Sequence, residues 1–213
     1  MGIDFNKIEA IIFDFDDTLV DEEKWVRERW EKTIQFTEAE LQIEEFGGAF
    51  WEIYRKRGWR YKKHVNEALQ ICGKGDNQVG KIVDYFLNQT VDESLFEGVS
   101  EFLNFIKDDY KLGILTNGRK EVQYDRIERV GISKYFSSVI CAFDNPKPDP
   151  EPYLKILNDL GVLPENSVYV SHEQDDFDGA KRIGMSTVHV NFSSEIGMKN
   201  SIIDHGLKNH SKY

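Results

Sequence analysis

The second half of the sequence alternates short apolar runs with longer segments whose apolar residues recur with a helical period. The runs "KLGILTN" (111–117), "FSSVICAF" (136–143), "NSVYVS" (166–171) and "STVHVNF" (186–192) each follow such a helical segment. Runs that are apolar on successive residues are typical of strands covered on both faces. Strands separated by helices favour parallel units with right-handed crossovers. We therefore predict an α/β fold with a doubly wound parallel sheet.

One further apolar run, at residues 8–15, lies far from the others in the chain. Between about residues 20 and 90 the sequence is charged, aromatic and free of proline, and it carries no strand-like run. The first run can join the same sheet if this segment forms a separate insertion. We predict a Rossmann-like core from residues 1–19 and 91–213, interrupted by an all-helical cap domain at residues 20–90.

The insertion shows helical spacing at its start. Val26, Trp30 and Ile34 recur every four residues, which gives an apolar stripe on one helix face. Thr37 followed three residues later by Glu40 matches a capping box. This pair predicts that a second helix of the insertion begins close to Thr37.

Charge and cysteine content limit the class of partner. The 213 residues carry a formal net charge of −11, which argues against binding to nucleic-acid backbones and to anionic membranes. The two cysteines, Cys72 and Cys141, are too few and too far apart for a disulfide framework or a cysteine metal site. The N-terminus lacks the pattern of a signal peptide, and no apolar run approaches membrane-spanning length. We expect a cytoplasmic protein that acts on a small molecule, and the sequence gives no indication of oligomeric state.

Polar residues follow the predicted strands. Asp14 and Asp16 end the first strand, residues 116–118 (Thr-Asn-Gly) end the second, Lys147 follows the third and residues 172–176 follow the fourth. Ligands of doubly wound sheets bind at the carboxyl ends of the strands. We therefore expect these four groups to meet at one edge of the sheet.

These residue types suit phosphoryl transfer. Asp14 and Asp16 are two residues apart in an extended chain and can address one pocket. One carboxylate can attack phosphorus while the other protonates the leaving oxygen, and a divalent cation would offset their repulsion. Thr116 and Asn117 suit phosphate binding through a hydroxyl and free backbone N–H groups. Lys147, between two prolines, can neutralise charge that builds on the phosphoryl group.

Four motifs in order resemble the haloacid dehalogenase superfamily, in the subgroup with a helical cap after the first motif. They are "DFDDT", "ILTNG", "KPDP" and an acidic loop before "GAKRIGM", and the resemblance spans about residues 8 to 192. It implies that Asp14 is the nucleophile and Asp16 the general acid and base. It also implies that Thr116 binds phosphate and that Lys147 neutralises the intermediate. Mg²⁺ would bind Asp14, the backbone carbonyl of Asp16 and an acid of the fourth motif.

The fourth motif departs from the family pattern, which is Gly-Asp, three residues, then Asp, ahead of Gly-Ala. In "SHEQDDFDGA", Asp176 takes the second acidic position, and Ser171 and His172 replace the Gly-Asp pair. Three hypotheses follow. Glu173 or Asp176 preserves a Mg²⁺ site, or His172 shifts the preference toward Mn²⁺ or Co²⁺, or the site is weakened or inactive. We carry Asp14, Asp16 and Asp176 as the predicted metal ligands.

Two functions are therefore considered. The first is a metal-dependent phosphatase that hydrolyses a small phosphorylated metabolite, a sugar phosphate or a nucleotide, through an aspartyl-phosphate intermediate. The resemblance implies that family members that cleave carbon–halogen bonds use no metal and need no acid two residues after the nucleophile. An acid at this position, Asp16, therefore favours phosphoryl transfer over carbon–halogen cleavage. The alternative is a catalytically impaired relative that binds a phosphorylated ligand or a protein partner, and His172 is its main support.

Overall fold

A computed structural model describes residues 3–57, 61–89 and 92–190 of the chain. The chain divides into two compact units, one formed by Met1–Glu22 and Glu93–Tyr213 and the other by Glu23–Asp92. The C-terminal tail from residue 193 lies outside the described residues. Within the described part of the chain, no helix is both long enough and apolar enough to cross a membrane.

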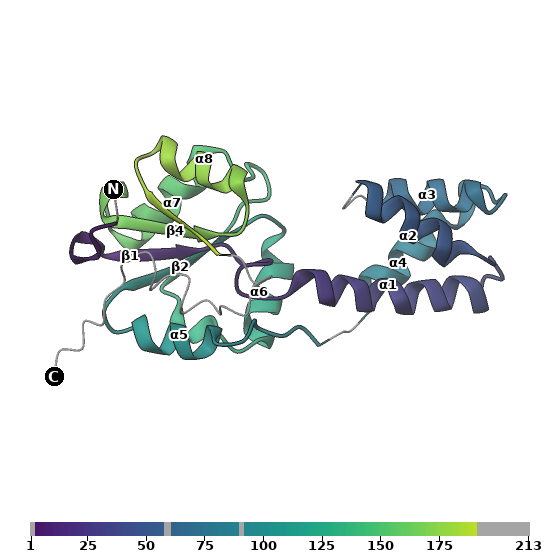
Figure 1. Ribbon diagram of the computed structural model, residues 1–213, viewed down its shortest axis with the longest axis horizontal. Coiled ribbons are helices and arrows are strands. Elements are labelled where there is room, and N and C mark those ends of the chain that lie inside the picture. Colours follow the sequence, from purple (N-terminus) through teal and green to yellow (C-terminus); the bar gives the residue numbers. More distant parts are fainter. Residues whose placement is uncertain (1–2, 58–60, 90–91, 191–213) are drawn as a thin grey trace. The chain divides into compact units, whose positions relative to one another are not determined.

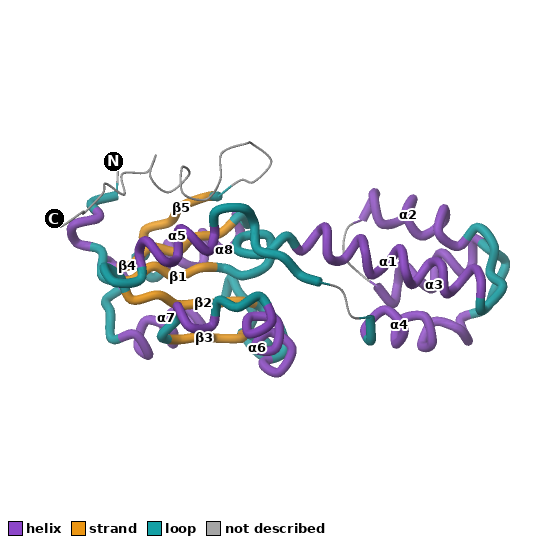
Figure 2. Tube along the Cα trace, turned by 90° about the horizontal axis from the view of Figure 1, so that it is seen from below, coloured by secondary structure: helices purple, strands orange, loops and turns teal. Residues whose placement is uncertain are grey.

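The first unit contains a sheet of five strands, all parallel, in the order β3-β2-β1-β4-β5 (Figure 2). This arrangement confirms the predicted doubly wound sheet, because β1 pairs with two strands that come much later in the chain. The strands are β1 (Ala10–Phe13), β2 (Lys111–Thr116), β3 (Ser138–Cys141), β4 (Ser167–Ser171) and β5 (Ser186–His189).

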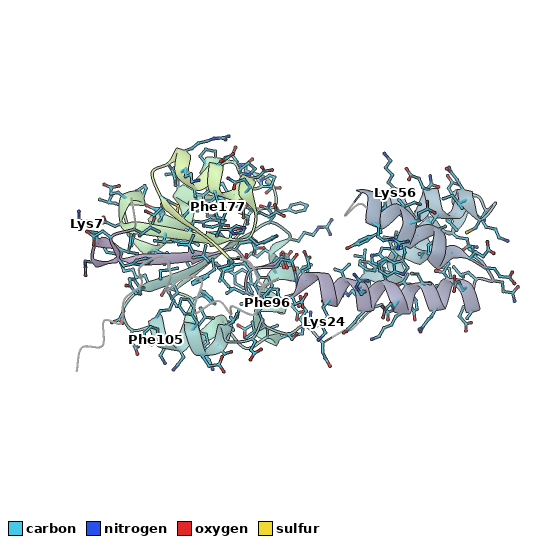
Figure 3. The ribbon with its side chains drawn as sticks, viewed as in Figure 1. Lys7, Lys24, Lys56, Phe96, Phe105 and Phe177 are labelled. Carbon is cyan, nitrogen blue, oxygen red and sulfur yellow. The ribbon has the colours of Figure 1, made fainter. Side chains whose placement is uncertain are left out.

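Helices cover both faces of this sheet. Figure 1 shows α5 and α6 on one face, and α7 and α8 on the other. Phe177 of α8 is buried against the sheet, whereas Phe105 of α5 is exposed (Figure 3). The helices are α5 (Val99–Ile106), α6 (Lys120–Arg129), α7 (Pro150–Leu160) and α8 (Gln174–Arg182), with short 3-10 turns at Phe5–Lys7, Ser133–Tyr135 and Pro164–Asn166.

Side chains of β1 alternate between two cores, as period-two geometry requires. Ile11 and Phe13 pack into the core on the α5 side, while Ala10 and Ile12 pack into the core with α7 and α8. The next position on the α7 and α8 side is Asp14. The buried strand therefore delivers a carboxylate to the edge of the sheet, on the side of α8.

The second unit is helical and has its own aromatic core. Trp30 lies between Phe50 and Phe86, with ring centroids 4.0 Å and 4.3 Å away. All three side chains are buried. The role of this unit as a cap stays a prediction. Its elements are α1 (Glu22–Ala39), α2 (Phe46–Arg57), α3 (Tyr61–Ile71), a 3-10 turn (Asp76–Gln78) and α4 (Val79–Leu87).

The predicted helix start at Thr37 is wrong, because α1 continues without a break to Ala39. Thr37 is buried, and its hydroxyl donates a hydrogen bond to the backbone oxygen of Thr33 at 2.7 Å. A threonine inside a helix can bond the carbonyl four residues back instead of capping a new helix. The apolar face of α1 extends through this turn, and that burial outweighs the local capping pattern.

Tight packing of α8 against α7 generates a stability prediction. A Cβ atom at Gly179 would lie 2.7 Å from the Tyr153 ring and 2.8 Å from the backbone oxygen of Pro148. The Pro148 backbone oxygen cannot move away without distorting the chain. We therefore expect Gly179→Ala to lower the free energy of unfolding by about 1–3 kcal/mol in urea denaturation.

Gly80→Ala is the matched control, since a Cβ atom there would meet no heavy atom within 4 Å. It lies in α4 and is expected to be neutral or to stabilise by up to about 1 kcal/mol. Equal effects of the two substitutions would contradict the close contact between α7 and α8.

Candidate active site

The site is built on the loop that follows β1. The backbone N–H of Asp14 donates to the oxygen of Val170 at 2.9 Å, which continues the pairing of β1 with β4. The backbone oxygen of Phe15 then accepts from the N–H groups of Leu19 (2.9 Å) and Val20 (3.2 Å), and this closes a tight turn. Asp14 is therefore held at the sheet edge by backbone hydrogen bonds and is 5% exposed.

On the α8 side, one ammonium group joins the site. Lys147 Nζ donates to Asp14 Oδ1 at 2.7 Å, to Asp176 Oδ2 at 2.7 Å and to the Tyr169 hydroxyl at 2.9 Å. Asp176 Oδ2 also accepts hydrogen bonds from the hydroxyls of Ser171 (2.9 Å) and Tyr169 (3.2 Å). The structure thus brings three predicted site residues, Asp14, Lys147 and Asp176, into one buried cluster.

Asn117 fixes the backbone of Lys147. The Lys147 N–H donates to Asn117 Oδ1 at 2.8 Å, and Asn117 Nδ2 donates to the Lys147 oxygen at 3.5 Å. The Asn117 side chain, directly after β2, therefore holds the loop after β3 in place. Phosphate binding by Asn117 stays a prediction, and its backbone N–H would have to provide it.

On the α6 side, Asp16 meets residues that the sequence reasoning missed. Gln123 Nε2 lies 3.2 Å from Asp16 Oδ2, 3.1 Å from Thr116 Oγ1 and 2.8 Å from the Asn117 oxygen. Arg126 pairs with Asp16 Oδ1 through its Nη2 atom at 2.6 Å. The sequence did carry one signal for them: Gln123 and Arg126 are three residues apart shortly after "TNG", so they lie on the same face of a helix that begins near the site.

Arg126 has a second acidic partner, Glu93. The distance from Arg126 Nε to Glu93 Oε1 is 2.7 Å, and the two side chains are 5% and 2% exposed. Glu93 lies at the chain's return from the helical unit. Nothing in its local sequence links it to a residue on α6, so sequence analysis had no signal for this ion pair.

The two aspartates of the first motif have opposite pKa shifts. Burial favours the neutral form of Asp14, but the charge and hydrogen bond of Lys147, together with the neighbouring His172, outweigh it, so its pKa is lowered. At Asp16, burial and the neighbouring Asp14 charge outweigh Arg126, so its pKa is raised. The site therefore keeps Asp14 ionised and favours a proton on Asp16.

Charges on the α8 side are mutually reinforcing. Burial opposes the charge on Lys147, yet the carboxylates of Asp14 and Asp176 raise its pKa above the ordinary value. Burial and the same carboxylates raise the pKa of Tyr169 well above that of free tyrosine. The phenol consequently stays protonated and available as a donor at neutral pH.

His172 stands beside Asp14. Its Nδ1 is 3.6 Å from Asp14 Oδ2 and 3.3 Å from Thr18 Oγ1, and its Nε2 is 3.2 Å from Glu173 Oε1. Burial opposes protonation of the imidazole, but the Asp14 carboxylate and nearby acids raise its pKa. The fourth motif thus presents a nitrogen ligand, or a cation when protonated, to the predicted nucleophile.

The described donors do not fit Mg²⁺, which requires a near-ideal octahedron of oxygen ligands. The fourth-motif group nearest Asp14 Oδ2 is a histidine nitrogen. Asp176 Oδ2 is already bound by three donors, and the carboxylate of Asp16 faces α6, so that Asp16 would contribute only its backbone carbonyl. Among the described residues, no three His, Cys, Asp or Glu side chains are grouped so that they could hold a metal ion.

The metal assignments therefore stay predictions from the family resemblance. They comprise Mg²⁺ on Asp14, Asp16 and Asp176, and the shift toward Mn²⁺ or Co²⁺ that His172 suggested.

The comparison with protein families agrees with the motifs and the fold. Residues 11–190 match the family described as haloacid dehalogenase-like hydrolase. This span covers most of the chain, so the protein belongs to that family and is a hydrolase. The superfamily expected from the four motifs is thereby confirmed.

Relatives of known name and structure cover most of this chain. A glyceraldehyde 3-phosphate phosphatase of Methanopyrus kandleri is 28% identical over 86% of this chain and 84% of its own length. A phosphorylated carbohydrates phosphatase of Thermotoga maritima is 29% identical over 85% of this chain and 84% of its own. The crystal structure of a putative β-phosphoglucomutase of Thermotoga maritima has a TM-score of 0.69 at 23% identity. It covers 93% of this chain and 92% of that one, and it shows the shared fold.

The position of His172 generates a prediction about metal binding. His172→Asp replaces an imidazole beside Asp14 with two hard oxygens. We expect the variant to bind Mg²⁺ at least about tenfold more tightly than the wild type in isothermal titration calorimetry.

Gln174→Asp is the control, because it adds the same charge two residues further along at an exposed position. It should leave Mg²⁺ affinity unchanged. Equal affinity in the wild type and His172→Asp would contradict the placement of His172 at the ligand position.

Glu22 generates a prediction about pH. Burial, reinforced by the neighbouring acids of the loop after β1, raises its pKa from 4.5 to about 8. Between these values the folded state binds more protons than the unfolded state, so this group makes stability fall as pH rises. We expect the stability of the wild type, relative to Glu22→Gln, to fall between about pH 5 and pH 8.5, measured by urea denaturation at each pH. Parallel pH profiles for the two proteins would show that Glu22 is not protonated in the folded state.

Proposed function

We propose that the protein is a phosphomonoesterase that hydrolyses a small phosphorylated metabolite through an aspartyl-phosphate on Asp14. One observation carries this proposal: Asp14 and Asp16 follow the same strand in two different surroundings, Asp14 bound by Lys147 Nζ at 2.7 Å and Asp16 held by residues of α6, and their pKa values are displaced in opposite directions. A carboxyl group with a lowered pKa beside one with a raised pKa is the arrangement that nucleophile and general acid require.

The relatives support the class of substrate. Their names specify glyceraldehyde 3-phosphate, phosphorylated carbohydrates and phosphoglycolate. We therefore place sugar phosphates and related phosphorylated carbohydrates first among the substrates and nucleotides second. Selection among them is assigned to the helical unit, Glu23–Asp92, acting as a cap.

In the first step, a carboxylate oxygen of Asp14 attacks phosphorus, and the bond between phosphorus and the leaving oxygen breaks. Asp16 gives its proton to that oxygen, so an alcohol leaves rather than an alkoxide. Lys147, which already binds Asp14 Oδ1, supplies positive charge next to the new acyl phosphate. The product is a phosphorylated Asp14 and an ionised Asp16.

In the second step, a water molecule attacks the phosphorus of the acyl phosphate. The carboxylate of Asp16 takes a proton from this water, which restores the acid form of Asp16. Cleavage of the bond between phosphorus and Asp14 releases inorganic phosphate and regenerates the carboxylate. Asp16 and the attacking water account for every proton transferred in these two steps.

The phosphoryl oxygens are assigned to the turn after β2. Thr116 is buried, and its hydroxyl lies between Gln123 and the Asn117 oxygen. The backbone dihedral angle φ of Gly118 is 134°, a value that residues with a side chain rarely adopt. A Cβ atom there would lie 3.0 Å from the Gln123 amide. Glycine thus allows close approach of this turn to α6 and of the backbone N–H groups to a phosphate.

A second candidate function is binding without catalysis. The observation that favours it is His172, which replaces the first acid of the fourth motif and lies beside Asp14. In this case the site would retain a phosphorylated ligand, or a protein partner, without hydrolysing it.

Asp14→Asn separates these functions. We expect it to lower phosphate release from p-nitrophenyl phosphate and from a panel of sugar phosphates by on the order of 10³-fold or more, since it removes the nucleophile. Phosphate release should be measured in EDTA and with Mg²⁺, Mn²⁺ or Co²⁺ added.

Asp175→Asn, at an exposed acid next to Asp176, is the matched control and should retain full activity. If the wild type hydrolyses no phosphate ester with any of these metals, the phosphatase proposal fails and binding is favoured.

A further inference from the structure

Proton transfer by Asp16 requires that its carboxyl be held in a defined orientation. We propose that Gln123, Arg126 and Glu93, here called the α6 network, position Asp16 as the general acid. This inference rests on the proposed function. It assigns a role in the reaction to three residues that lie outside the four motifs.

The α6 network holds both oxygens of Asp16 separately. Arg126 pairs with Oδ1 at 2.6 Å, and Gln123 Nε2 donates to Oδ2 at 3.2 Å. The two donors come from successive turns of one helix. A carboxyl group bound at both oxygens cannot rotate without breaking one of these contacts, so its orientation is set by α6.

Arg126 is itself fixed on all sides. Its Nε donates to Glu93 Oε1 at 2.7 Å, its Nη1 donates to Gln123 Oε1 at 2.7 Å, and its Nη2 pairs with both Glu93 Oε1 and Asp16 Oδ1. Its guanidinium carbon lies 5.0 Å from the centre of the Phe15 ring. Nε and Nη2 share Glu93, Nη2 also reaches Asp16, and Nη1 binds Gln123, so every nitrogen of the planar group is held, which makes the guanidinium a rigid support.

Burial argues that the network serves the reaction. Arg126 and Glu93 side chains are 5% and 2% exposed, and buried ion pairs return little net stability because desolvation is costly. If the Arg126–Glu93 ion pair served only folding, it would need no further contacts with site residues. Instead it continues through Gln123 to Asp16 and to Thr116 Oγ1, at 3.1 Å. The network therefore joins the proton donor to the predicted phosphate-binding turn.

A positioned acid has a measurable signature. Phenolate is a poor leaving group that needs a proton, whereas p-nitrophenolate leaves readily without one. Loss of orientation at Asp16 should therefore slow the first step much more for phenyl phosphate than for p-nitrophenyl phosphate. The ratio kcat/KM reports this step, because it does not depend on the later hydrolysis of the acyl phosphate, in which Asp16 acts equally for both esters. A defect that merely loosened the fold would slow both substrates by the same factor.

The test compares Arg126→Met with the wild type on these two esters. We expect kcat/KM for phenyl phosphate to fall by about 10²-fold or more and kcat/KM for p-nitrophenyl phosphate to fall by less than about tenfold. Arg126→Lys should recover only part of the loss, because one ammonium cannot reproduce three directed contacts.

Arg129→Met is the matched control. It removes a charge from the same helix, three residues further on, where the side chain is 40% exposed and 3.7 Å from Glu93 Oε2. It should leave both rates unchanged. Gln123→Ala is a second variant that keeps the Arg126–Glu93 ion pair, and it is expected to show the same dependence on the leaving group should Arg126→Met fail to fold.

The outcomes separate the two proposals. A wild type that hydrolyses neither ester overturns the proposed function and this inference together. A wild type that is active, with Asp14→Asn inactive, upholds the proposed function. If Arg126→Met and Gln123→Ala then lower kcat/KM equally for both esters, or for neither, the positioning role of the α6 network is overturned alone.

Discussion

The ammonium group of Lys147, held between Asp14 and Asp176 at 2.7 Å from each, is the interaction on which the site depends. It keeps a buried carboxylate ionised where burial alone would favour its neutral form. It also connects two loops that follow different strands, since Asp14 follows β1 and Lys147 follows β3. Without this charge, an ionised Asp14 at the buried end of β1 would be strongly unfavourable.

A second cation repeats this arrangement on the other side of the loop. Arg126 contacts Asp16 and Glu93, as Lys147 contacts Asp14 and Asp176. Lys147 and Arg126 are therefore each paired with two acids, which leaves an excess of negative charge where a phosphate would bind. The raised pKa values of Asp16, Glu22 and His172 all act to reduce that excess by retaining protons.

Much of the fold could be predicted from the sequence because strands covered on both faces have an unmistakable composition. The run at residues 8–15 contains β1, and the order of strands and helices after residue 96 is confirmed. The helix start at Thr37 failed because a local capping pattern was outweighed by burial of the α1 face, which is a tertiary effect.

The site was predictable where residues lie directly after a strand: Asp14 and Lys147 in the loops after β1 and β3, and Asp176 in the first turn of α8 after β4. Asp14, Lys147 and Asp176 meet as the topology required. Gln123 and Arg126 lie inside a helix, and their contact with Asp16 depends on how α6 packs against the sheet. The pairing with Glu93 spans 33 positions and left no pattern in the sequence.

The central claim is that Asp14 carries the phosphoryl group during turnover. Rapid quenching of the wild type in acid during hydrolysis of p-nitrophenyl phosphate, followed by peptide mass spectrometry, tests it directly. The account predicts the mass of one phosphoryl group on the peptide that contains Asp14, located at that residue, and none in Asp14→Asn. Turnover with no such adduct, or with the phosphoryl group on another residue, would contradict it.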